Sequence, residues 1–247
     1  ATRRETAVRR AGIRRASVAS WAAPAGVMLV AAVSPFERPL PVAIGGFTVT
    51  TLELAVMVAL TAGAVGWLLG RLGAGRVGRP PAWAQWRAPI MLPIAAVLAV
   101  VLAAALAAPE FRGNALRFWG RLVAAAGLFL LTLNAVTTRH LAHRLIATLL
   151  AAGSIVGALA VLELAQVAWV MDWLRAFRPG FHVVGGQVRA TSTLFYPTIA
   201  SMYLEVVFAL GLCWLVAAGQ SATRRMVWPF TALVLVGAGI AATFTRA

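Results

Sequence analysis

The sequence is poor in several residue types, and their scarcity limits its chemistry. It contains no lysine, only seven acidic residues and a single cysteine. One cysteine excludes an internal disulfide framework and a thiolate metal site. Because Cys213 lies within an apolar run, we expect a small packing or lipid-facing residue. The phosphate loop, the dinucleotide glycine motif and the nucleophile elbow of soluble enzymes are also missing.

Apolar residues, in contrast, are abundant and grouped. They make up 61% of the 247 residues and gather in runs of about twenty, the length that crosses a hydrocarbon core of roughly 30 Å. The runs are 17–33, 49–70, 89–108, 115–136, 145–170, 194–217 and 226–244. No repeat or strand-hairpin pattern accompanies them. The sequence therefore predicts an all-α fold, a polytopic transmembrane helix bundle of about seven spans forming a single domain over 1–247.

The positive charge predicts orientation. All 22 basic residues are arginines, which give a formal charge of +15, and most lie in short connections between apolar runs. Alternate connections put fourteen arginines on the side of the N-terminus and five on the other, namely Arg38, Arg112, Arg175, Arg178 and Arg189. The positive-inside rule places the arginine-rich side in the cytoplasm. We expect a basic cytoplasmic segment over 1–16, an outer loop over 171–193 and no nucleic-acid partner.

Five ionisable residues lie inside these runs: Glu53, Arg117, Arg121, Glu163 and Glu205. A charge at the centre of a span costs about 2.5–3.5 kcal/mol, so such residues usually face the interior with a partner. Arg117 and Arg121 share a helix face and offer forked donors suited to pyrophosphate oxygens. The same two arginines could instead pair with Glu53 and Glu163, or reach the lipid headgroups. Glu205 is expected to be structural or protonated.

The three histidines give little support for catalysis or metal binding. His140 and His143 are spaced i, i+3 in a short inner loop, and no third ligand with suitable spacing is near. We therefore expect no metal and no other cofactor. His182, in the outer loop, is a candidate base, but a lone loop histidine is seldom catalytic.

Four stretches together resemble a known family. They are "SPFERPLPVAIGGFTVTTLELAVMVAL" (34–60), "LRFWGRLVAAAGLFLL" (116–131), "VRATSTLFYPTIASMYL" (188–204) and the terminal "ATFTRA" (242–247). In this order they are similar to the N-terminal half of the O-antigen ligase and O-antigen polymerase-like membrane family. The chain starts without a methionine and stops directly after an apolar run, so we expect it to be the N-terminal part of a longer protein.

The resemblance implies an activity in the cell envelope. Members of the family transfer a glycan from undecaprenyl pyrophosphate to an acceptor hydroxyl on the outer face of the bacterial inner membrane, without a nucleotide or a required metal. By the same resemblance Arg189 and Arg246 are the expected pyrophosphate ligands, with the hydroxyls of residues 191–193 as further donors. Phe195 and Tyr196 stand where the family often has glycine and asparagine, and the family's outer-loop histidine would lie beyond Ala247.

A second interpretation remains open at this stage. The chain could be a non-catalytic, ligase-like subunit packed in a larger membrane-protein complex. The expected partners are membrane lipids and a polyprenyl-pyrophosphate-linked glycan under the first interpretation, and other membrane subunits under the second. The catalytic residues themselves cannot be assigned from the sequence.

Overall fold

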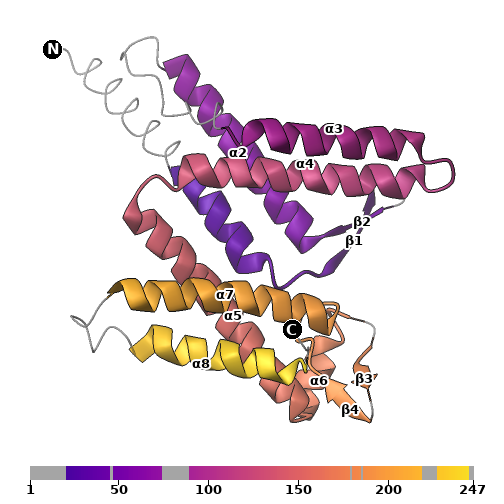
Figure 1. Cartoon of the computed structure of the whole chain (residues 1–247), viewed down its shortest axis with the longest axis vertical. Helices are drawn as coiled ribbons and strands as arrows, with labels where there is room; N and C mark the ends of the chain where they lie inside the picture. Colours follow the sequence, from indigo (N-terminus) through magenta and orange to yellow (C-terminus); the bar gives the residue numbers. More distant parts are fainter. Residues whose placement is uncertain are drawn as a thin grey trace. The chain divides into compact units, whose positions relative to one another are not determined.

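The structure is a computed structural model that describes residues 21–44, 47–73, 89–178, 180–184, 186–218 and 227–244 (Figure 1). The expected cytoplasmic segment 1–16, residues 74–87 of the arginine-rich connection and Arg246 lie outside these residues. Within the described ranges the chain is mostly helical, with two small antiparallel sheets.

The elements follow one another in a simple order. A first helix, Trp21–Val33, precedes β1 (Pro39–Ile44), β2 (Phe47–Thr50), α2 (Thr51–Gly73), α3 (Met91–Ala107), α4 (Arg112–Ala135), α5 (Arg139–Leu164), α6 (Ala168–Leu174), β3 (His182–Val184), β4 (Gln187–Arg189), α7 (Pro197–Ala218) and α8 (Val227–Ala242). Each of the seven predicted apolar runs overlaps a helix, and the run 145–170 also overlaps the start of α6. Among the described residues, four helices (α2, α4, α5 and α7) are long and apolar enough to cross a membrane, and three apolar helices are shorter.

Three local expectations were wrong. The span predicted over 145–170 ends as α5 at Leu164, because Gln166 adopts a left-handed φ of 54° and a separate short helix, α6, follows. The histidines expected in an inner loop, His140 and His143, lie in the first turns of α5. Two strand hairpins occur where none was expected. Their strands have only three to six residues, too few for an alternating pattern to emerge.

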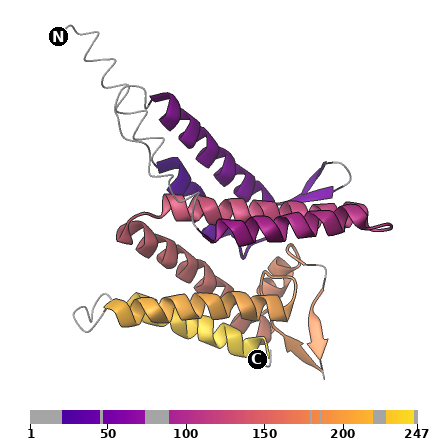
Figure 2. The ribbon, with the colours of Figure 1, turned by 45° about the horizontal axis from the view of Figure 1, so that its top comes forward.

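The chain packs as two compact units. Unit 1 comprises Ala1–Val27 and Val56–Thr138, and unit 2 comprises Met28–Ala55 and Arg139–Ala247. In unit 1, α3 and α4 lie side by side, as both views show (Figures 1 and 2), and the indole Nε1 of Trp119 donates to the carbonyl of Leu98 at 3.0 Å. A glycine lets α2 approach α4: a Cβ added at Gly63 would lie 2.5 Å from Leu131 Cδ1. Small residues permit such close helix packing in membranes.

The core of unit 2 lies between α5, α7 and α8. Its buried side chains include Leu150, Val156, Leu204, Val207, Leu233 and Val236. The closest approach joins α5 to α8, where a Cβ added at Gly239 would lie 2.6 Å from the Cα of Gly157. Gly153 and Gly157 stand four residues apart on α5, the GxxxG spacing typical of close membrane-helix contacts. This packing sets the end of α8 beside the end of α5.

Candidate functional site at Arg189 and Glu163

Arg189, a predicted pyrophosphate ligand, lies at the end of β4 and contacts the C-terminal end of α8. Its Nε donates to the carbonyl of Thr243 at 3.1 Å and its Nη2 to that of Phe244 at 3.4 Å. The next amide, of Ala190, donates to the carbonyl of Ala242 at 3.2 Å. The last carbonyls of a helix lack intrahelical partners and carry partial negative charge, so a cation is favoured there. Arg189 therefore joins two segments more than fifty residues apart.

The second predicted ligand, Arg246, lies outside the described residues. Phe244, which precedes it by two positions, is the last described residue and accepts a bond from Arg189. The described residues 242–244 of the terminal stretch thus meet the stretch "VRATSTLFYP" at this end of unit 2. That Arg189 and Arg246 lie within reach of one pyrophosphate stays a prediction.

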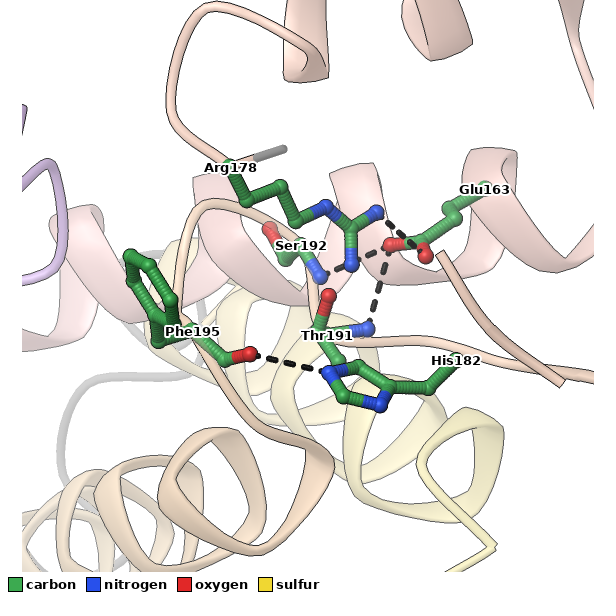
Figure 3. A network of polar contacts seen from close by, with 6 residues as sticks. All are labelled: Glu163, Arg178, His182, Thr191, Ser192 and Phe195. Carbon is green, nitrogen blue, oxygen red and sulfur yellow. Dashed lines mark hydrogen bonds and ion pairs between the residues drawn. The ribbon is translucent and has the colours of Figure 1, made fainter. Parts of the chain in front are cut away.

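A buried carboxylate lies beneath this segment. Glu163, in the last turn of α5, is fully buried, and Figure 3 shows the donors that surround it. Its Oε1 accepts a bond from Nη2 of Arg178 at 2.5 Å, and its Oε2 accepts the backbone N–H groups of Thr191 and Ser192 at 3.1 and 2.7 Å. We call these four residues the Glu163 cluster. The cluster ties the end of α5 to the loop after α6 and to the turn before α7.

The turn that faces Glu163 has an unusual backbone. Ser192 adopts a left-handed φ of 53°, a conformation that L-residues other than glycine seldom take. With this backbone conformation, the N–H groups of two successive residues point at one carboxylate oxygen, an arrangement known as an anion-binding nest. The negative charge that fills this nest belongs to the protein itself. The sequence "RATSTL" therefore folds around Glu163.

The cation of the cluster is also enclosed. Arg178 is 4% exposed, and its guanidinium carbon lies 4.7 Å from the centre of the Phe181 ring. Burial of two charges costs several kcal/mol per ion, and this cost is recovered only with close pairing and additional hydrogen bonds. The carboxylate of Glu163 has both, since one cation and two amides bind it. The sequence predicted a partner for Glu163 and considered Arg117 and Arg121, whereas Arg178 is the cation that binds it.

Several polar atoms of the cluster lack a partner within the described part of the chain. They are Nε and Nη1 of Arg178 and the hydroxyls of Thr191 and Ser192. Buried groups of this kind are commonly satisfied by ordered water. The expectation that residues 191–193 present hydroxyls to a lipid-linked pyrophosphate was wrong, because all three are at most 2% exposed and Thr193 donates to the carbonyl of Pro35. The hydroxyls belong to the interior of unit 2.

His182 faces Arg189 across the small sheet. The two residues are register partners of β3 and β4, and Gly186, with φ 78°, forms part of the turn between the strands. The Nε2 of His182 lies 3.1 Å from the carbonyl oxygen of Phe195 (Figure 3). The imidazole ring is 5.4 Å from the ring of Tyr196. If Nε2 carries the proton, it donates to this carbonyl and Nδ1 is the acceptor. Phe195 and Tyr196 are each about half exposed.

The remaining charged candidates lie in other surroundings. Glu53 and Thr50 form a reciprocal capping box at the start of α2, in which each side chain accepts the other's backbone N–H, at 3.1 and 3.2 Å. On α4, in unit 1, Arg117 is half-buried and Arg121 exposed. Glu205 lies on the exposed side of α7 and accepts a bond from the hydroxyl of Ser201 at 2.5 Å.

Sequence reasoning missed the importance of Arg178. It was counted as one of several arginines in an outer loop, and nothing in its immediate neighbours distinguishes it from Arg175, which forms an exposed pair with Asp172. An indirect signal was present, because a carboxylate in the apolar run of α5 requires a nearby cation. The GxxxG spacing on α5 could likewise have indicated close helix contacts, which Gly153 makes with α7 and Gly157 with α8.

Comparisons with other proteins add no relative. No protein-family model, curated protein or solved structure matches the chain. The resemblance to the ligase family therefore rests on the four sequence stretches. Described residues of two of these stretches meet at Arg189.

Proposed function

We propose that the chain is part of a bacterial inner-membrane glycan transferase that resembles the O-antigen ligases. In this proposal it binds a polyprenyl-pyrophosphate-linked glycan, whose sugar is transferred to an acceptor hydroxyl on the outer face. One observation carries the proposal: Arg189 contacts the residues that lead directly to Arg246, although the two arginines are 57 positions apart. Arg189 and the residues that precede Arg246 thus lie at one end of unit 2.

The chemistry suits an anionic leaving group. In the transfer, the acceptor oxygen forms a bond to the anomeric carbon, the bond from that carbon to the pyrophosphate breaks, and the pyrophosphate leaves with the electron pair. The acceptor proton passes to a base that we do not assign. Guanidinium groups donate forked hydrogen bonds to phosphate oxygens and stabilise the charge that develops on them. We propose Arg189 and Arg246 for this role. For Arg117 and Arg121 of α4 we propose pyrophosphate binding as a separate prediction within unit 1.

The proposed topology has seven spans with a cytoplasmic N-terminus. A cysteine at Gly75 should then lie inside and a cysteine at Gly185 outside, each in a Cys213→Ser background. We expect a membrane-impermeant maleimide added to intact spheroplasts to label the second cysteine and spare the first, because the reagent reaches only the outer face. Labelling of both after lysis is the control. Labelling of Gly75→Cys alone in intact spheroplasts would contradict the orientation.

The activity is tested most simply by replacing Arg189 with lysine. Lysine keeps the charge and can still donate to a carbonyl at the end of α8, but it loses the fork that matches a pyrophosphate. We expect transfer from a lipid-linked glycan, assayed with the full-length protein in liposomes, to fall by about 10- to 100-fold, the effect of losing one charge-assisted hydrogen bond. Arg175→Lys, in the neighbouring loop, should leave transfer unchanged. Equal transfer by wild type and Arg189→Lys would remove Arg189 from the site.

A specific observation also favours the non-catalytic alternative. Both Nε and Nη2 of Arg189 donate to carbonyls at the end of α8, which is a structural use of the side chain. A subunit that only packs in a larger complex would need this contact and no substrate. In that case Arg189→Lys changes the yield of the assembled complex and leaves glycan transfer in cells unaffected.

A further inference from the structure

The position of Arg189 depends on few contacts of its own hairpin. The strands β3 and β4 have three residues each, and a two-stranded hairpin of this size is at best marginally stable alone. The residues that follow Arg189 are, in contrast, bound one after another. Ala190 binds α8, Thr191 and Ser192 bind Glu163, and Thr193 binds the carbonyl of Pro35.

We infer that Glu163 is a positioning residue for Arg189: by binding the amides of Thr191 and Ser192 it fixes the strand end that carries Arg189 against the end of α8. The consequence for substrate binding rests on the proposed function. Glu163 is fully buried, so it acts through Arg189 and makes no contact with a ligand outside the protein. Thr191 lies two residues from Arg189, so the turn bound to Glu163 limits the movement of the backbone that carries the guanidinium group.

Arg178 has a different part in this arrangement. Its Nη2 is bound to Glu163 and its side chain is enclosed, so it neutralises the carboxylate within the protein. A direct role of Arg178 in holding pyrophosphate would require the group to leave Glu163. The inference therefore assigns the substrate cation to Arg189 and the internal counter-ion to Arg178.

Two variants separate these roles. In Glu163→Gln, one carboxamide must serve both the cation and the two amides, and its NH2 group opposes one of them. In Glu163→Gln with Arg178→Met, the cation is removed, and the carboxamide oxygen can accept the amides of Thr191 and Ser192. If Glu163 positions Arg189, the double variant should recover the hairpin protection and the ligand binding that Glu163→Gln loses. Glu205→Gln is the matched control, because Glu205 is exposed and bound only to Ser201 among the described residues.

The experiment uses the full-length protein in lipid nanodiscs, with hydrogen exchange and equilibrium binding of farnesyl pyrophosphate as the two measurements. The informative amides are those of Ala190 and the β3–β4 ladder, because their acceptors are not Glu163. In Glu163→Gln we expect them to exchange about tenfold faster or more, while the core amides of α5 and α8 change little. Binding should weaken by about 10- to 100-fold. The double variant should regain most of the exchange protection and most of the binding affinity. The Glu205→Gln control should match wild type.

The outcomes are distinct. Unchanged exchange of the hairpin amides in Glu163→Gln overturns the inference, and so does equal acceleration throughout α5 and α8, which indicates a general loss of stability. Weaker binding by the double variant than by Glu163→Gln assigns Arg178 to the ligand and also overturns it. If wild type fails to bind farnesyl pyrophosphate while the hairpin responds as expected, the proposed function is wrong and the positioning of Arg189 by Glu163 stands.

Discussion

Replacing Arg178 with methionine is expected to destabilise the protein by about 3–5 kcal/mol, because the change leaves the buried carboxylate of Glu163 without its cation. Methionine keeps much of the volume of the side chain, so loss of charge is the main change. Thermal unfolding in detergent, followed by tryptophan fluorescence, should show a large decrease in Tm. The destabilisation should be smaller in Glu163→Gln with Arg178→Met, since neither buried charge remains.

Arg175 provides the matched control three residues earlier in the chain. It pairs with Asp172 at 2.7 Å, but both side chains are about two-thirds exposed. Exposed pairs of this kind contribute about 0–1 kcal/mol, so Arg175→Met should change Tm little. Similar shifts for Arg175→Met and Arg178→Met would show that the Glu163 cluster does not stabilise the fold.

The contact between α5 and α8 is expected to be sensitive to added side-chain volume. An added Cβ at Gly157 would meet the backbone carbonyl of Leu235, which cannot move without displacing α8. We expect Gly157→Ala to destabilise unit 2 by about 1–3 kcal/mol, the range of overpacked cores. Because Arg189 binds the carbonyls that follow α8, the variant should also weaken binding of farnesyl pyrophosphate.

Gly120 on α4 is the control for this substitution. An added Cβ there has no neighbour within 4 Å, and alanine is favoured over glycine in a helix by up to about 1 kcal/mol. Gly120→Ala should therefore be neutral or slightly stabilising. Equal Tm values for Gly157→Ala and wild type would mean that α5 and α8 are further apart than described here.

The helices could be predicted because their signal is long. A run of about twenty apolar residues indicates a helix without any knowledge of its neighbours. A helix was therefore expected in each of the seven runs, and one overlaps each of them. The end of α5 was missed because the apolar Leu164 and Ala165 continue the run, and nothing in the sequence marks the left-handed conformation of Gln166. The short strands β3 and β4 depend on their pairing for their conformation.

The site was predicted less completely, because it depends on contacts between distant segments. The proposed role of Arg189 followed from a resemblance. Its proximity to the end of α8 follows from topology, since β4 precedes α7 and α8 returns to the same end. Arg178 pairs with Glu163 although fifteen positions separate them, because the loop after α6 folds back onto α5. The sequence holds no local signal for this fold. For the same reason, the hydroxyls of "ATST" were expected at a surface and are buried.

The central proposal is that Arg189, together with Arg246 beyond the end of α8, binds a polyprenyl pyrophosphate. Photo-crosslinking of the full-length protein in membranes, with a polyprenyl pyrophosphate that carries a diazirine near its headgroup, tests it most directly. Mass spectrometry should locate the label on residues 187–193 and on the segment that follows α8, with competition by undecaprenyl pyrophosphate and strong reduction in Arg189→Lys. Label that avoids both segments, or that is undiminished in Arg189→Lys, would contradict the claim.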